Sequence, residues 1–191
     1  MKRLILAAAL AAAASPAAAE TYEIDGDHSS ISFRVRHLVG KVTGKFTRYE
    51  GHFDYEEGKP KSWKANAVIE TASIDTGVEA RDKHLRQADF FDAARCPKIE
   101  FKSTKVSDVA GNKAKLYGDL TMRCVTKPIV LELELGGVAK DPWGNVKAGA
   151  TATGKINRTD WGLEWNKKVE TGGVLVGEEI ELTLEIEGTV K

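Results

Sequence analysis

Apolar and polar side chains alternate along most of this chain with a period of two residues, which is typical of β-strands that bury one face. Ile31, Phe33 and Val35 share one face of the segment 30–36, whereas the residues between them are polar. The same alternation runs through residues 63–70, 129–135 and 180–187. Weaker strands are expected at residues 42–48, 52–55, 98–106, 115–123 and 146–157, and several of these segments contain glycine. One buried face and one solvent-exposed face predict an antiparallel sheet.

One segment departs from this pattern and predicts a helix. Thr76 and Glu79 match a capping box, and residues 78–94 follow with apolar side chains on one side before Pro97. A single helix among about eight or nine strands favours an all-β fold, either a closed antiparallel barrel or a sandwich.

Two cysteines lie on either side of a predicted turn. Gly111 and Asn112 separate two expected strands, and the midpoint between Cys96 and Cys124 is residue 110, close to that turn. Residues equally far from a hairpin turn lie opposite each other, so the two thiols are within reach of a disulfide, although two free thiols fit the same spacing.

The N-terminus has the features of a secretory signal. Lys2 and Arg3 precede an apolar run of 11 residues, which is followed by small residues up to Ala19. The apolar run is too short to span a membrane. We therefore expect residues 1–19 to be a cleaved signal peptide and residues 20–191 to form a single domain. An exported chain meets an oxidising compartment, which in a bacterium is the periplasm.

Composition excludes some classes of partner. Without Lys2 and Arg3, 26 basic residues face 28 acidic residues, which gives a net charge of −2. This charge and the absence of a basic stripe in the sequence argue against a nucleic-acid partner.

Candidate chemistry is sparse. The four histidines, His28, His37, His52 and His84, form no H-x-x-x-H or H-E-x-x-H motif, so we expect no metal site. There is no G-x-S-x-G elbow and no phosphate-binding loop, so no catalytic residue is assigned. The segment 81–86 is rich in charged side chains that would either contact a ligand head group or form a solvated helix face.

Taken together, these residues resemble the YceI-like family, also called lipid/polyisoprenoid-binding YceI-like proteins. The most specific parts are R-D-x-H-L at residues 81–85 and D-F-F-D at residues 89–92. Further matching pieces lie at residues 22–25, 28–29, 33–37, 44–46, 73–76, 97–101, 117–121, 125–128, 141–144, 154–158 and 160–162. Cys124 replaces the glycine that the family usually has there, and Cys96 replaces an often aromatic residue, which supports a disulfide special to this chain.

The resemblance implies a lipocalin-like antiparallel β-barrel, extended over the helix, with an amphiphile in an elongated cavity. Strand parity and the helix face then give an expected cavity wall of Phe33, Val35, Phe46, Ile69, Leu85, Phe90, Phe91, Phe101 and Leu120. The expected polar contacts at the mouth are His37, Arg81, Asp82 and His84.

The leading hypothesis is a non-catalytic periplasmic protein that binds a polyisoprenoid, an isoprenoid quinone or a fatty-acid-like ligand, for transport or storage. It requires no cofactor other than such a bound lipid or quinone, and it allows transient contact with a membrane or a membrane redox protein. Two alternatives remain: a partner-binding or stress-response module with a solid core, and an enzyme that uses His28, His37 or Asp82 on a lipid-like substrate.

Overall fold

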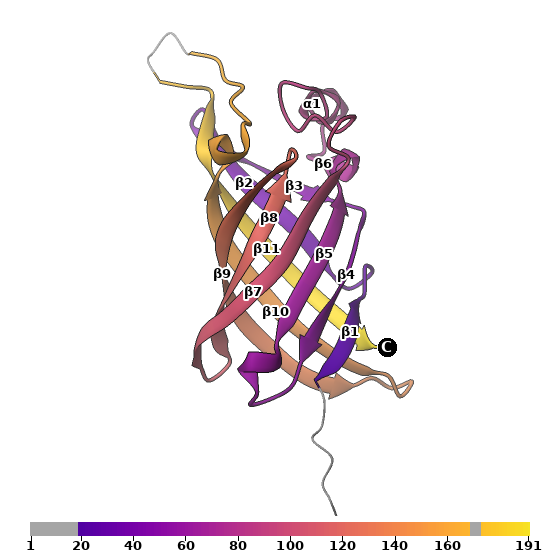
Figure 1. Ribbon diagram of the computed structural model, residues 1–191. Coiled ribbons are helices and arrows are strands. Elements are labelled where there is room, and N and C mark those ends of the chain that lie inside the picture. The colour runs from indigo at the N-terminus through magenta and orange to yellow at the C-terminus, as the bar shows by residue number, and fades with distance from the viewer. Residues whose placement is uncertain (1–18, 169–172) are drawn as a thin grey trace, which may run out of the picture.

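The computed structural model describes residues 19–168 and 173–191, and within them eleven strands form one antiparallel sheet that closes into a barrel (Figure 1). The strands are β1 (Glu20–Ile24), β2 (Ser30–His37), β3 (Gly40–Phe46), β4 (Tyr49–Tyr55), β5 (Lys64–Glu70), β6 (Ile74–Asp75), β7 (Lys98–Ala110), β8 (Lys113–Met122), β9 (Val125–Lys140), β10 (Val146–Asn157) and β11 (Val176–Val190). The helical elements are α1 (Glu79–Leu85) and three 3₁₀ turns, η1 (Pro60–Ser62), η2 (Thr71–Ser73) and η3 (Arg158–Trp161).

Eight of the strands form the ring, in the order β1, β4, β5, β7, β8, β9, β10 and β11, and β11 pairs with β1 to close it. Another part of β11 pairs with β2, and the sheet continues from β2 through β3 to β6. The prediction of a lipocalin-like barrel of about eight strands is confirmed. All nine predicted strands are present. β1 and β6 were not predicted, and β6, with two residues, is too short to show a period.

The helix is shorter than predicted. α1 covers Glu79–Leu85, and the residues after it, up to Arg95, form turns rather than the helix expected to residue 94. The turns after α1 bury both Phe90 and Phe91 in separate contacts, with Phe91 against Phe46 and Phe90 between His84 and Trp165. The expected capping box is also wrong, because the hydroxyl of Thr76 donates to Oδ1 of Asp82, at 2.5 Å.

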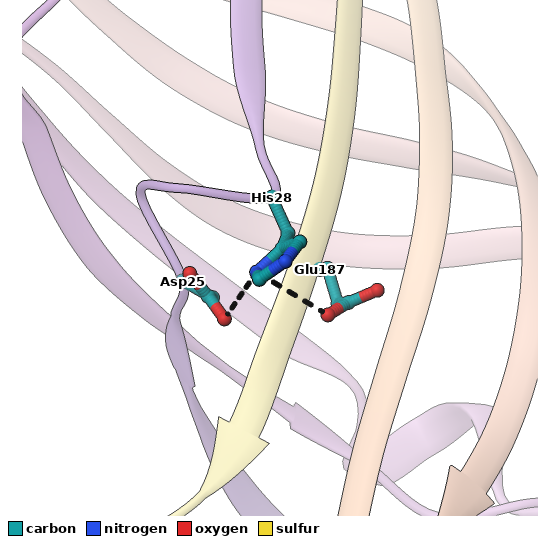
Figure 2. Close-up of side chains that lie close together, drawn as sticks. All are labelled: Asp25, His28 and Glu187. Carbon is teal, nitrogen blue, oxygen red and sulfur yellow. Dashed lines mark hydrogen bonds and ion pairs between the residues drawn. The ribbon is translucent and has the colours of Figure 1, made fainter. Parts of the chain in front are cut away.

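A polar cluster lies where β11 changes its neighbour from β2 to β1 (Figure 2). Nδ1 of His28 lies 2.9 Å from Oδ2 of Asp25 and 4.0 Å from Oε1 of Glu187. The backbone amide of Asp25 donates to the carbonyl of Glu187, and the Ser29 hydroxyl both donates to that carbonyl and accepts from the Glu187 amide. These bonds continue the pairing of β11 across the gap between two strands.

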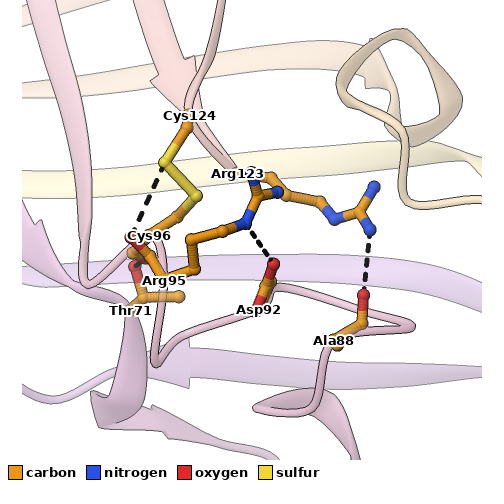
Figure 3. The surroundings of a disulfide bond; sticks show 7 residues. All are labelled: Thr71, Ala88, Asp92, Arg95, Cys96, Arg123 and Cys124. Atoms are coloured by element: carbon orange, nitrogen blue, oxygen red, sulfur yellow. Dashed lines mark hydrogen bonds and ion pairs between the residues drawn. A yellow bond between two sulfur atoms is a disulfide. The ribbon is translucent and has the colours of Figure 1, made fainter.

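The disulfide between Cys96 and Cys124 is present, with the two Cα atoms 5.5 Å apart (Figure 3). Cys96 lies just before β7, and Cys124 lies in the tight turn between β8 and β9. In the same turn, Arg123 donates to the carbonyls of Ala88 and Gly162. The disulfide and this arginine therefore attach the loop after α1 to the end of the barrel.

The end of the barrel that carries α1 is solid. Phe46 packs against Phe33, with ring centroids 5.9 Å apart, and meets Phe91 edge-on at 6.0 Å. Trp161 is buried, and its indole N–H donates to the carbonyl of Leu120 at 3.0 Å. Among the described residues, no helix combines the length and the apolar character that a membrane crossing requires.

Candidate functional site

An apolar cavity of about 130 Å³ occupies the half of the barrel that lies away from α1, here called the hollow half. It runs from the middle of the barrel towards the end where η1 joins β4 to β5, where Tyr55 and Trp63 line it. Its wall includes apolar side chains from most strands of the ring, among them Ile24, Ile31, Phe53, Tyr55, Trp63, Ala65, Ala67, Phe101, Val106, Leu116, Leu131, Leu133, Leu135, Ala148, Ala150, Ala152, Leu184 and Ile186.

The cavity exists because two strands carry alanine where a larger residue would fill the barrel. Ala65 and Ala67 line it from β5, and three alanines, Ala148, Ala150 and Ala152, line it from β10. In the ring of eight, β5 and β10 are four strands apart in either direction, so the two alanine strands face each other across the lumen. An eight-stranded barrel has an interior just wide enough for side chains or one ligand, and short side chains on opposite walls leave room for the ligand.

Aromatic side chains surround the end of the cavity near η1. The rings of Tyr55 and Trp63 lie 5.1 Å apart, and the indole N–H of Trp63 donates to the carbonyl of Glu56 at 2.6 Å. Phe53 stacks on the buried ring of Tyr22, with centroids 5.2 Å apart. The hydrogen bond fixes the indole in place, so this rim of the cavity is formed before a ligand enters.

The expected wall residues divide between the two halves of the barrel. Phe101 lines the cavity, and its ring lies directly over Gly118. The others lie in the solid end or beside it: Phe46, Ile69, Phe91 and Leu120 in the core, Phe33 and Leu85 packed against it, Phe90 buried beside His84 and Trp165, and Val35 half-buried on β2 opposite Ile180.

The family of the chain follows from comparison with known proteins. The profile of the YceI-like domain matches residues 22–188, which is nearly all of the barrel. The chain belongs to the YceI-like family. It is 39% identical over 194 residues to the protein YceI of Escherichia coli O157:H7, with 98% of each chain covered.

Solved structures agree with this assignment and with the barrel. The YCEI protein of Campylobacter jejuni is 33% identical and superimposes with a TM-score of 0.71, over 82% of this chain and 90% of that one. A polyisoprenoid-binding domain from Saccharophagus degradans has the same fold, with a TM-score of 0.65 and 14% identity, over 89% of this chain and 98% of that one.

In this YceI-like barrel, the expected polar mouth residues lie at the solid end rather than at the hollow half. His37 ends β2, and Nε2 of His84 lies 2.9 Å from Oδ2 of Asp89. Arg81 donates to the hydroxyl and the carbonyl of Thr76. The Thr76 hydroxyl in turn donates to Asp82. Arg81 and Asp82 therefore serve to attach α1 to the preceding segment.

The polar cluster at β11 is the described group of side chains that comes nearest to a metal site, because its three ligand atoms lie within 4.8 Å of one another. However, Nζ of Lys147 lies 2.9 Å from Asp25 and 2.7 Å from Glu187 and supplies the positive charge itself. Hydrogen bonds from Lys147 and then His28 hold the pKa of Asp25 far below its ordinary value. The hydrogen bonds that Lys147 donates to Glu187 and then to Asp25 raise the pKa of Lys147.

Sequence reasoning did not find the alanines of β10 or the role of Trp63. A signal was available for β5, where Trp63, Ala65 and Ala67 share one face of the alternating pattern. Alternating alanines at Ala148, Ala150 and Ala152 give the same signal. What the sequence did not supply was the order of strands in the ring, which makes the two sets face each other.

Proposed function

We propose that this YceI-like protein is a periplasmic carrier that holds one long apolar chain, of the polyisoprenoid or isoprenoid-quinone type, in the hollow half of the barrel. The observation that carries the proposal is the pair of facing alanine strands, β5 and β10, which leave an apolar cavity in an otherwise packed barrel.

The physical reason is the burial of ligand surface. Each Å² of apolar ligand surface that leaves water contributes about 25 cal/mol before the costs of binding are subtracted. The side chains that surround the cavity are predominantly alanine, leucine, isoleucine and aromatic residues, which favour a hydrocarbon over a polar ligand. A long isoprenoid is insoluble in water, so a protein that moves it between membranes must enclose it.

An isoprenoid is the favoured ligand class for two reasons. The Saccharophagus degradans domain with the same fold is named for polyisoprenoid binding. In addition, the wall is almost entirely apolar, which suits the hydrocarbon chain of an isoprenoid.

Export to the periplasm is supported by the disulfide, which persists in an oxidising compartment. The expected signal peptide of residues 1–19 lies almost wholly outside the described residues. We propose no catalytic role and no cofactor. Asp82 is bonded within the α1 region, His28 pairs with Asp25, and neither lines the cavity that would hold a substrate.

The first test is native mass spectrometry of the protein purified through its own export route, followed by organic extraction. The proposal expects a bound mass that extracts as an isoprenoid or a quinone. A protein that carries no ligand and also fails to bind added decylubiquinone would contradict the carrier and favour the partner-binding module.

A matched pair of variants then places the ligand. Ala150→Phe puts a ring into the cavity from β10 and should abolish binding of decylubiquinone. Thr153→Phe adds a ring of the same size to the exposed face of the same strand, so binding should be unchanged. Equal binding by both variants would show that the ligand lies elsewhere.

A further inference from the structure

The hairpin between β9 and β10 joins the cavity wall to an exposed tip. At its base, Leu135, Gly137, Ala148 and Gly149 line the cavity. Gly137 has φ 92°, and the register of the two strands shifts between Gly149 and Ala150, so the hairpin bends at this point. It extends past the end of the barrel in Figure 1. Whatever contacts the tip therefore lies next to the end of the cavity.

The turn at the tip is held by the side chain of Asp141. Oδ1 of Asp141 accepts from the backbone amides of Trp143, at 2.9 Å, and Asn145, at 2.8 Å, and Oδ2 accepts from the Asn145 side chain at 2.8 Å. The Asp141 amide donates to the Asn145 carbonyl. Only the backbone of Trp143 takes part in these bonds, so the turn does not need an indole at this position.

The indole is nevertheless the most solvent-exposed aromatic group among the described large apolar side chains. Trp143 is 85% exposed, and Val138 on the same hairpin is 47% exposed. Tryptophan combines a large apolar ring with one N–H donor, and it therefore prefers the boundary between lipid head groups and hydrocarbon.

We propose that the β9–β10 hairpin docks on the surface of a lipid bilayer, with Trp143 inserted among the head groups, so that the cavity end faces the membrane from which its ligand is drawn. This inference rests on the proposed carrier function. A bilayer suits the tip better than a protein partner does, because one indole and one valine fall far short of the roughly 1,000 Å² that a specific protein interface buries. The tip carries Lys140 beside Asp141, so docking relies on the indole rather than on charge.

The test uses vesicles of dioleoyl phosphatidylcholine, with and without brominated acyl chains. The protein should sediment with the vesicles, and the bromines should quench part of its tryptophan fluorescence. Trp143→Ser should weaken vesicle binding about tenfold and remove the quenching. The control is Val39→Ser, which removes a fully exposed apolar side chain from the β2–β3 turn at the solid end and should leave both readouts unchanged.

A second readout separates this inference from the carrier function. Binding of decylubiquinone without vesicles should be the same for the protein and for Trp143→Ser. Quinone binding without vesicle binding would overturn the docking surface and leave the carrier intact. Vesicle binding through Trp143 without quinone binding would support docking and contradict the carrier. Self-association of the protein that Trp143→Ser abolishes, without vesicle binding, would assign the tip to a second copy and overturn the proposal.

Discussion

Nζ of Lys147 lies 2.9 Å from Oδ2 of Asp25, so a residue of β10 neutralises the turn between β1 and β2 across 122 positions of sequence. The same ammonium contacts Glu187 of β11 at 2.7 Å. One lysine thus joins three parts of the barrel at the place where β11 changes partner.

This cluster predicts how stability depends on pH. Hydrogen bonds with Lys147 and His28 lower the pKa of Asp25, so its contribution is present above its ordinary pKa of 3.8 and is lost as the pH falls below that value. Glu187 and Asp25 raise the pKa of Lys147, so its contribution is present below its ordinary pKa of 10.5 and is lost as the pH rises beyond it.

Lys147→Met should therefore lower the urea midpoint at pH 7 and flatten its dependence on pH at both extremes. Urea unfolding at pH 3, 7 and 11 measures this. The control is Lys155→Met, which removes a lysine paired with Glu179 on the solvent-exposed face of the same strand and should change the midpoint little. Equal effects of the two variants would contradict a special role for Lys147.

The disulfide should contribute to stability but not to ligand binding. The two cysteines are 28 positions apart, and closing a loop of this size stabilises by about 3–4 kcal/mol in the chain-entropy model. The double variant Cys96→Ser with Cys124→Ser should lose about that amount in chemical unfolding. Its affinity for decylubiquinone should be unchanged, because the disulfide lies at the solid end; a large loss of affinity would contradict the separation of the two ends.

Gly118 should tolerate no larger side chain, because a Cβ at this position would lie 2.4 Å from the ring of Phe101 and 2.8 Å from the Lys102 carbonyl. Gly118→Ala should cost about 1–3 kcal/mol and shift the Phe101 ring towards the cavity, which weakens ligand binding as well. Gly26→Ala, where a Cβ meets no atom within 4 Å, is the control and should leave both properties unchanged. Thermal unfolding and quinone titration of the two variants provide the comparison.

Phe91 should be essential to the solid end. Its buried ring meets Phe46 edge-on, so Phe91→Ala should destabilise the barrel by about 3–5 kcal/mol through the space it leaves. Leu38→Ala, at a partly exposed position in the β2–β3 turn, should cost much less in the same denaturant titration. A small effect of Phe91→Ala would show that the loop after α1 does not stabilise the barrel.

Much of the barrel could be predicted from the sequence, because alternation is a local property of strands. The face shared by Ile31, Phe33 and Val35 is the face that points into the barrel. The disulfide could also be predicted from the sequence. Glu100 pairs with Thr121 and Phe101 with Leu120, and this register brings Cys96 and Cys124 together beyond the strand ends.

The position of the cavity could not be predicted in the same way. Alternation gives the face of Phe46 and Phe101 but not their height along the barrel, so residues of the solid end and of the hollow half looked alike. The helix was predicted too long because the burial of both Phe90 and Phe91 depends on contacts that no local pattern shows. The cluster of Lys147 with Asp25 was missed for the same reason.

The seam between β1 and β11 has a consequence for how the chain folds. Tyr22 pairs with Val190 and Ile24 with Gly188, so the ring closes through residues more than 160 positions apart. Contacts of such long sequence separation form late, since the entropy of closing the loop is lost before any contact is gained. Until then, β1 and β11 present open edges that can pair with other chains. We therefore expect slow final closure, and a period of vulnerability to aggregation that ends when β11 joins β1.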